Sequence, residues 1–229
     1  MLALTLFGVF FLIALAGVPL LFSILITTVG IIWAQDLGHP LETIFLSFIG
    51  GVEPFILLAV PLFIFAGELL AQGGVGKRIV EFARVLFGWL PGGLGVVTVM
   101  SCTMFGGVSG SAIADTAAIG SLVIPAMIAR GYSRGFAAAL LAVAGTIALL
   151  MPLSIPFMIY AFISGVSMRT LSMAGLLPAL ASAIALIVVC MWHGRKTGCD
   201  NGEDRSTMPQ IWAATRDAGP ALLMPVIII

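Results

Sequence analysis

The residues best able to do chemistry lie in one short stretch, Gly106–Asp115, with the sequence GGVSGSAIAD. Its glycines allow a sharp backbone turn and the close approach of an ion or ligand. Ser109 and Ser111 can cap a helix and offer hydroxyl oxygens, and Asp115 can hold a cation or a proton. Long apolar runs lie on both sides, so the stretch predicts a polar site inside an apolar environment.

A second interruption lies downstream, in Gly145–Pro156, with the sequence GTIALLMPLSIP. Proline removes a helical hydrogen bond and clashes with the preceding turn, so Pro152 and Pro156 interrupt any helix here. Broken helices beside hairpin tips form the sites of secondary transporters, in which unwound carbonyls bind Na⁺ and helix N-termini face an anionic substrate. The two interruptions together therefore predict a transport site.

The elements that position these residues follow from composition. Of the 229 residues, 61% are hydrophobic and 9% are charged, and the mean hydropathy is +1.20. The apolar residues are contiguous rather than alternating as in a β-barrel, so we expect an all-α integral membrane protein in contact with the lipid bilayer. Runs near the length that crosses a membrane occur at Leu2–Trp33, Pro54–Leu70, Phe136–Ser164 and Leu171–Trp192. Pro19 leaves open whether the first run is one helix or a bent pair.

Other classes of protein are disfavoured by the same composition. The formal net charge is zero and no basic stripe alternates with aromatic residues, which argues against nucleic acid as a partner. The three cysteines fit unpaired thiols of a membrane protein better than a disulfide framework. No cofactor is predicted.

Basic residues predict the topology, because lysine and arginine are retained on the cytoplasmic side. They lie before the opening stretch in Lys77–Arg84, after it at Arg130 and Arg134, and again between 195 and 216. The loop Ala34–Glu53 has none and is predicted to be external, and only Arg169 stands apart. Both ends of the segment 90–131 are thus expected on the cytoplasmic side.

Two full crossings or one re-entrant hairpin would return the chain to that side. From Gly92 to Phe105 is about 14 residues, which rise about 21 Å as a helix and fall short of the roughly 30 Å of hydrocarbon. We therefore expect a re-entrant hairpin whose tip is GGVSGS, with an arm N-terminus that suits an anion and arm-ending carbonyls that suit a cation. The helix dipole favours a carboxylate such as Asp115 in the first turn of the second arm, which would make its role structural. Alternatively Asp115 binds an ion or proton, or pairs with a mobile arginine.

The remaining segments complete the predicted organisation. Val75–Phe87 places charged residues on one helical face, which favours an amphipathic helix along the cytoplasmic interface over a lid packed on the bundle. The expected order is N-terminal transmembrane helices (1–74), this interfacial helix (75–89), the re-entrant helical hairpin (90–131), a discontinuous transmembrane helix (135–166), a transmembrane helix (170–193), a cytoplasmic loop (194–219) and the start of a second repeat (220–229).

The run MFGGVSGSAIADTAAIGSLVIPAM, followed by RGYSRGFAAALLAVAGTIALLMPLSIPFMIYAFISGVS, resembles the large membrane subunit (M, DctM-like) of tripartite ATP-independent periplasmic (TRAP) transporters. The upstream run LLAVPLFIFAGELLAQGG is similar to that subunit too, so the resemblance covers nearly the whole chain. The chain departs from the family pattern at Pro152-Leu153, where many members have consecutive prolines, and at Ala148, where many have glycine. The family's large subunit is also longer, so this chain is expected to hold its N-terminal half.

The resemblance implies a Na⁺-coupled importer of organic acid anions, such as C4-dicarboxylates or sugar acids, in the inner (cytoplasmic) membrane of a bacterium or archaeon. It implies an elevator mechanism with inverted repeats, a small membrane subunit (Q, DctQ-like) and a periplasmic substrate-binding protein (P, DctP-like). The Na⁺ ligands it implies, partly through backbone carbonyls, are Ser109, Gly110, Ser111, Gly145, Thr146 and Pro152. The substrate-site residues it implies are Ser111, Asp115 and Ser154.

Three other functions fit parts of the sequence. Gly107–Gly110 matches the GxSG of rhomboid-like intramembrane serine proteases, but that chemistry needs a histidine at the depth of the serine. The two histidines are His39, in the loop predicted to be external, and His193, at the inner membrane edge, so neither is expected at that depth. An ion channel would also use a re-entrant hairpin, and a structural or nonfunctional truncated membrane subunit is the remaining alternative.

Overall fold

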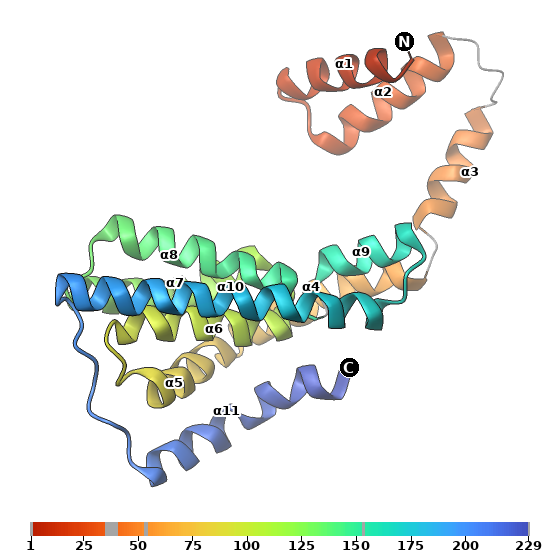
Figure 1. Cartoon of the computed structure of the whole chain (residues 1–229). Coiled ribbons are helices and arrows are strands. Elements are labelled where there is room, and N and C mark those ends of the chain that lie inside the picture. Colours follow the sequence, from red (N-terminus) through yellow and green to blue (C-terminus); the bar gives the residue numbers. More distant parts are fainter. Residues whose placement is uncertain (1, 35–40, 53–54, 153, 229) are drawn as a thin grey trace. The chain divides into compact units, whose positions relative to one another are not determined.

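The computed structural model describes residues 2–34, 41–52, 55–152 and 154–228. Every regular element within these ranges is a helix, which confirms the predicted all-α class. The chain divides into two compact units, Met1–Pro54 and Phe55–Ile229. Figure 1 shows the helices of both units.

The N-terminal unit contains α1 (Leu2–Leu15), α2 (Leu20–Ala34) and α3 (Leu41–Val52). The first apolar run is thus a bent pair, and α1 and α2 pack against each other. The turn between them holds Gly17, whose φ of +88° is rare for residues with a side chain, and Pro19. Helix α3 lies within the segment 34–53 that the sequence analysis treats as an external loop.

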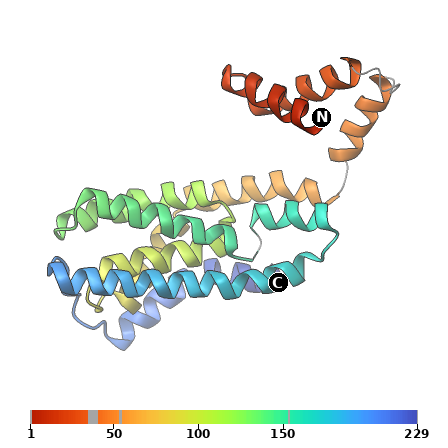
Figure 2. The same cartoon turned by 45° about the horizontal axis from the view of Figure 1, so that its top comes forward.

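The C-terminal unit contains α4 (Phe55–Gln72), α5 (Val75–Phe87), α6 (Gly93–Ser109), α7 (Ala112–Ala129), α8 (Arg134–Ile147), the 3₁₀ turn η1 (Ala148–Leu150), α9 (Ile155–Ser164), α10 (Met168–Thr197) and α11 (Met208–Ile228). Helix α4 lies beside α9, and α11 lies beside α5 (Figures 1 and 2). Among the described residues, α7, the stretch α8–α9 and α10 are long and apolar enough to cross a membrane, and the bent pair α4–α5 adds a fourth candidate. These helices agree with a multi-pass membrane protein.

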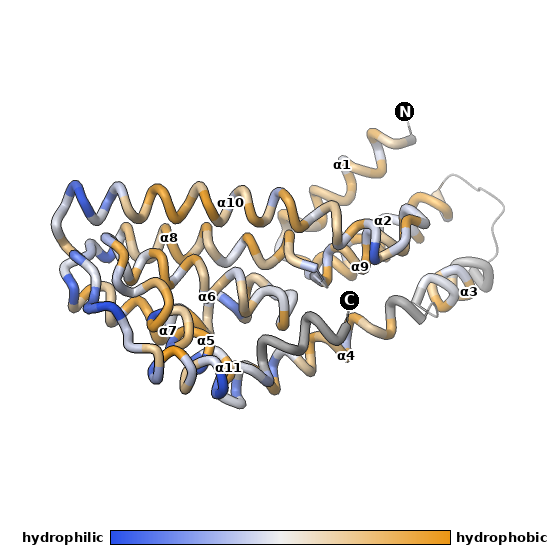
Figure 3. The backbone as a smooth tube through the Cα atoms, turned by 60° about the horizontal axis from the view of Figure 1, so that its bottom comes forward, coloured by the Kyte–Doolittle hydropathy of each residue, from blue (hydrophilic) through white to orange (hydrophobic). Residues whose placement is uncertain are grey.

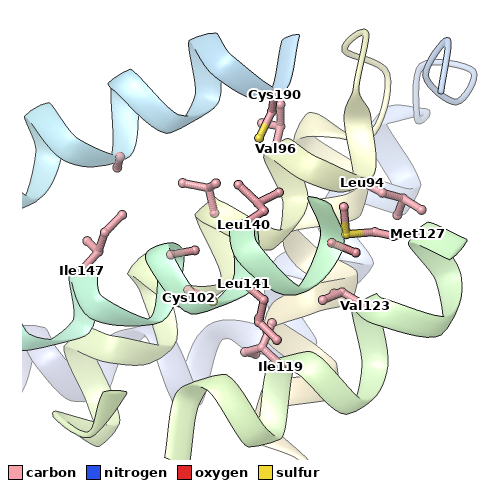
Figure 4. Packing of buried hydrophobic residues seen from close by; sticks show 14 of the residues in the cluster. Leu94, Val96, Cys102, Ile119, Val123, Met127, Leu140, Leu141, Ile147 and Cys190 are labelled. Carbon is pink, nitrogen blue, oxygen red and sulfur yellow. The ribbon is translucent and has the colours of Figure 1, made fainter. Parts of the chain in front are cut away.

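The core of this unit forms around α6, which packs against α5, α7, α8 and α10. All residues of α6 except Met100 and Met104 are buried, so protein encloses this helix on nearly every side. Figure 4 shows part of the core, in which labelled side chains from four helices meet: Leu94, Val96, Cys102, Ile119, Val123, Met127, Leu140, Leu141, Ile147 and Cys190. Burial of this apolar surface holds α6 at the centre.

The amphipathic segment is helix α5, which meets α4 at an angle of 66°. Gly74 allows this bend with a φ of +74°. Ile79, Phe82 and Ala83 are buried on the side that packs against the bundle, whereas Lys77 and Arg78 are exposed. The apolar face of α5 is therefore covered by other helices of the unit.

The predicted loop 194–219 is shorter in the structure. Helix α10 continues to Thr197 and ends at Gly198, which has a φ of +63° and donates its N–H to the Gly194 carbonyl at 2.9 Å. Helix α11 already begins at Met208, because the Gln210 side chain accepts a hydrogen bond from the Thr207 N–H at 2.9 Å in a capping arrangement. Figure 3 shows hydrophilic residues gathered between α10 and α11 and at the neighbouring end of the bundle.

Candidate functional site

The stretch GGVSGSAIAD forms the tip of a helical hairpin made by α6 and α7. Gly110 ends α6 with a φ of +62°, and its N–H donates to the Gly106 carbonyl at 3.0 Å. Ser111 follows in extended conformation and begins α7, because its hydroxyl accepts a hydrogen bond from the Ala114 N–H at 3.4 Å. The glycine and the serine thus end one helix and start the next within two residues.

Asp115 and Ser109 form a buried polar pair at this tip. The Ser109 hydroxyl donates to Oδ1 of Asp115, and its oxygen accepts from the Ser111 N–H at 3.2 Å. Asp115 is 0% exposed and Ser109 is 1% exposed. The second carboxylate oxygen, Oδ2 of Asp115, has no hydrogen-bond partner among the described residues. A buried carboxylate oxygen without such a partner is costly, which favours the binding of a cation or a proton.

The second interruption lies between η1 and α9, at Met151–Ser154. Pro152 and Ser154 are buried there, and Met151 and Ser154 are both extended. Ser154 occupies the N-cap position of α9, yet its hydroxyl does not cap the helix and has no hydrogen-bond partner among the described residues. The break therefore contributes a second buried oxygen without a partner.

Direct backbone contacts join the tip to the break. The Ile155 N–H donates to the Gly110 carbonyl at 3.4 Å. A Cβ atom on Gly106 would lie 2.6 Å from the Cα of Ala148 and 3.1 Å from Oδ2 of Asp115. Only glycine at 106 allows the 3₁₀ turn to come this close to the tip, which brings both interruptions to one place.

The two helices that flank the interruptions also touch. A Cβ atom on Gly145 would lie 2.1 Å from the Thr116 hydroxyl, so α8 can approach α7 only because residue 145 has no side chain. The Thr116 hydroxyl donates to the Ala112 carbonyl at 2.7 Å, in the first turn of α7. Helix α4 passes the tip as well, where a Cβ atom on Gly67 would lie 3.4 Å from the Ser109 carbonyl.

The structure thus gathers most of the expected site residues and separates one. Those at the tip, in the break or packed against them are Ser109, Gly110, Ser111, Asp115, Gly145, Pro152 and Ser154. The Thr146 side chain is exposed, and its hydroxyl donates to the Val143 carbonyl of its own helix at 2.7 Å. Three further residues pack at the tip or the break and were not predicted as site residues: Gly67, Gly106 and Thr116. Gly106 belongs to the stretch Gly106–Asp115, and Gly67 interrupts an apolar run.

The arrangement does not support the chemistry of a serine protease at Ser109. His193 stacks on Phe136 in the first turn of α8, with ring centroids 3.8 Å apart, at the opposite end of the hairpin from its tip. His39 lies outside the described residues. Ser109 instead donates to the Asp115 carboxylate, and no histidine among the described residues lies beside it to act as the base of a rhomboid-like protease.

A hairpin tip that meets a broken helix, with buried oxygens from both, is the arrangement of a membrane transporter site. Comparison with protein families gives the class more closely. The family model described as the DctM component of the tripartite ATP-independent periplasmic transporter matches residues 2–229. The chain belongs to this family, whose members are transporter permeases, and this confirms the resemblance drawn from the sequence.

Individual relatives agree with the family assignment. The chain is 36% identical over 213 residues to the 2,3-diketo-L-gulonate TRAP transporter large permease protein YiaN of Escherichia coli, covering 93% of this chain and 50% of the relative. It is 34% identical over 241 residues to the C4-dicarboxylate TRAP transporter large permease protein DctM of Rhodobacter capsulatus, covering 99% and 54%. It is 37% identical over 216 residues to the sialic acid TRAP transporter large permease protein SiaM of Vibrio cholerae, covering 94% and 48%. The chain thus spans about half the length of these relatives.

Proposed function

We propose that the chain forms part of the permease of a Na⁺-coupled TRAP transporter that imports organic acid anions by an elevator mechanism. The observation that carries this proposal is the meeting of the hairpin tip with the break before α9. There Asp115 and Ser154 each leave a buried oxygen that has no partner in the part of the chain that the structure describes. Buried polar atoms without partners are costly and are retained where a ligand completes them.

The proposal takes the hairpin to be re-entrant, and helix lengths support this. The start of α6 lies beside the end of α10, since a Cβ atom on Gly194 would lie 2.4 Å from the Gly92 nitrogen. Helix α6 has 17 residues and α10 has 30, which correspond to rises of about 25 Å and about 45 Å. A membrane crossed by α10 would therefore still enclose the tip of the shorter α6.

Within this proposal the coupling ion binds at the tip and the break. Ser109, Gly110, Ser111, Gly145 and Pro152 supply Na⁺ ligands, partly through carbonyl oxygens, and Thr146 contributes only through its backbone. Ser111 and Ser154 contact the anionic substrate, whose charge the N-termini of α7 and α9 favour. Asp115 remains assigned to the substrate site, and because it is buried and bonded to Ser109 it acts by attracting the cation that accompanies the anion.

The proposed transporter also needs partners. A small Q-like membrane subunit and a P-like periplasmic binding protein complete it, and the assembly lies in the inner membrane of a bacterium or archaeon. The names of the three relatives indicate three anions to try first: a C4-dicarboxylate, sialic acid and 2,3-diketo-L-gulonate.

The double variant Ser109→Ala, Ser111→Ala tests the proposal. Uptake of labelled succinate, sialic acid and 2,3-diketo-L-gulonate is measured in the assembled transporter while Na⁺ is varied against choline. Loss of two oxygen ligands is expected to raise the Na⁺ concentration for half-maximal uptake by about tenfold or more, since each factor of ten corresponds to about 1.4 kcal/mol.

Ser133→Ala is the matched control, because Ser133 caps α8 as Ser111 caps α7 but lies at the other end of the hairpin. It removes a helix cap without touching the proposed ion site. An unchanged Na⁺ requirement in the double variant would contradict the ion site, and an anion flux that grows without saturation would indicate a channel instead.

A further inference from the structure

The base of the hairpin, opposite its tip, is closed by residues that follow α10. Helix α6 begins after Gly92, which has a φ of +73° and lies so close to α10 that a Cβ atom on it would be 2.3 Å from the Cys190 carbonyl oxygen. Residue 92 is the N-cap of α6, and this clash leaves no room there for a side chain that could cap the helix. The cap comes instead from Asp200, whose Oδ2 accepts a hydrogen bond from the Leu94 N–H at 2.8 Å, while its backbone carbonyl accepts one from the Gly92 N–H at 2.8 Å.

Both carboxylate oxygens of Asp200 accept hydrogen bonds, although the residue is only 3% exposed. Besides Leu94, it accepts hydrogen bonds from Arg130 at 3.2 Å, from the Tyr132 hydroxyl at 3.2 Å and from the Gly202 N–H at 3.3 Å. Arg130 ends α7, and Tyr132 lies in the turn before α8. One buried side chain thus connects the start of α6, the end of α7 and the turn into α8.

Glu203 adds a second set of contacts next to Asp200. Its carboxylate accepts hydrogen bonds from Arg130 and, at 3.3 Å, from Arg84 of α5. Its backbone N–H donates to the Gly88 carbonyl at 2.8 Å. The segment Cys199–Glu203 is therefore held to the hairpin base by charged side chains and by main-chain bonds.

We propose that Asp200 is a positioning residue that fastens both ends of hairpin α6–α7 to the segment Cys199–Glu203, so that the hairpin, the start of α8 and the end of α10 move as one rigid body. This inference rests on the proposed function, in which the hairpin carries the ion site. A tip that exchanges ligands needs a fixed base, because a loose base would let the tip shift against the break before α9. Buried charged networks with every donor and acceptor satisfied provide such rigidity.

A disulfide across the base tests whether these parts move together. A Cβ atom on Gly131 would lie 3.6 Å from the Cβ of Cys199, within the range of about 3.5–4.5 Å that disulfides require. In the Gly131→Cys variant the native Cys199 is oxidised, and uptake of the anion identified by the preceding assay is compared before and after oxidation. The oxidised protein is expected to keep the uptake of the reduced one, because the linked parts never separate.

Loss of uptake on oxidation, with recovery on reduction, would overturn the proposal, since it would show that the linked parts move apart during transport. Gly131→Ala is the matched control for strain, because Gly131 has a φ of +89° that a side chain disfavours. Uptake by the disulfide variants is compared with that control.

Asp200→Asn tests the residue itself, with Asp204→Asn as its control, because Asp204 is an exposed carboxylate that directly follows the segment Cys199–Glu203. In the Gly131→Cys background, Asp200→Asn is expected to lower uptake and slow disulfide formation, and oxidation is expected to restore uptake because the covalent link replaces the lost contacts. Because a disulfide also stabilises a fold, uptake is compared at a temperature at which the reduced Asp200→Asn protein is still folded, so that a rescue there reports positioning. Equal behaviour of the two asparagine variants, or a failure of oxidation to restore uptake, would contradict the proposal.

Hydrogen exchange gives a measurement that needs neither the cysteine nor a known substrate. The Leu94 amide of the Asp200→Asn protein is expected to exchange about tenfold faster than that of the Asp204→Asn protein, because its acceptor has lost its charge. Equal rates would overturn the role of Asp200. Exchange and disulfide formation can both be measured in the absence of Na⁺ and substrate, so failure here is distinct from failure of the proposed ion site.

Discussion

A buried carboxylate lies at each end of hairpin α6–α7, and the two differ in how many hydrogen bonds they accept. At the base, Asp200 accepts hydrogen bonds from four donors on three segments of the chain. At the tip, Asp115 accepts one from Ser109, and its Oδ2 has no partner among the described residues. Ser154 beside the tip also leaves its hydroxyl without a partner.

This difference indicates a division of roles along one hairpin. An unpartnered buried polar group costs about 1–3 kcal/mol, whereas a satisfied charged network stabilises its surroundings. The base thus holds one geometry, whereas the tip keeps buried oxygens that have no hydrogen-bond partner among the described residues. If the comparison is right, changes at the tip should affect function through the ligand, and changes at the base should affect the geometry of the whole hairpin.

The largest effect is expected from Gly106→Ala, which obstructs the contact between tip and break. The added Cβ would lie 2.6 Å from the backbone of Ala148, which cannot give way as a flexible side chain would. We expect a loss of about 3 kcal/mol in unfolding free energy and loss of uptake, measured by thermal unfolding in detergent and by transport.

Gly135→Ala is the matched control, since nothing lies within 4 Å of the position that its Cβ would take in α8. It should leave stability unchanged or raise it slightly, because alanine has a higher helix propensity than glycine. A Gly106→Ala protein as stable and active as this control would show that the tip and the break do not need their close contact.

A smaller effect, and one of opposite sign for stability, is expected from Ser154→Ala. The variant removes a buried hydroxyl for which the described residues provide no hydrogen-bond partner, so the protein should become more stable by about 1 kcal/mol in thermal unfolding. Uptake should fall, because the variant removes a hydroxyl that the proposed function places against the substrate. The control is Ser164→Ala, whose hydroxyl is exposed and already bonded to the Tyr160 carbonyl. A stabilised variant with full uptake would remove Ser154 from the proposed site.

Local signals explain why the tip of the hairpin could be predicted from the sequence. A glycine that ends one helix and a serine that begins the next act over three or four residues, and prolines break a helix wherever they stand. The sequence therefore contains the turn at Gly110 and the break near Pro152. The sequence does not show which face of a helix a side chain lies on. Thr146 was therefore expected at the site, although its side chain is exposed and it is the neighbouring Gly145 whose backbone packs against α7.

The base of the hairpin could not be predicted in this way, because its contacts are not local. Asp200 and Leu94 are 106 positions apart, and Glu203 and Arg84 are 119 apart. A carboxylate in a short polar segment is expected to be solvated, and only packing brings it to the start of another helix. The close approach of Gly106 to Ala148 is of the same kind, since the sequence shows a glycine but not what it faces.

The smallest predicted effect tests the base through one donor, with Tyr132→Phe. Burial, with a further contribution from the charge of Asp200, raises the pKa of the Tyr132 hydroxyl, so the folded protein keeps this proton. An unfolded tyrosine loses it near pH 10, and above that pH deprotonation favours the unfolded state. Near pH 7 the variant should lose only about 0.5 kcal/mol, because Asp200 keeps its other donors.

As the pH rises through 10 to 11, the wild type should lose stability that the Tyr132→Phe variant keeps. The difference in unfolding temperature between the two proteins should therefore shrink and then reverse, as measured by thermal unfolding from pH 7 to 11. Tyr160→Phe, which removes the chain's other phenol from an exposed position on α9, controls for general effects of alkaline pH. If the difference in unfolding temperature between wild type and Tyr132→Phe stays constant across this range, Tyr132 is not enclosed beside Asp200. The base would then have one donor fewer to Asp200, which weakens its contrast with the tip.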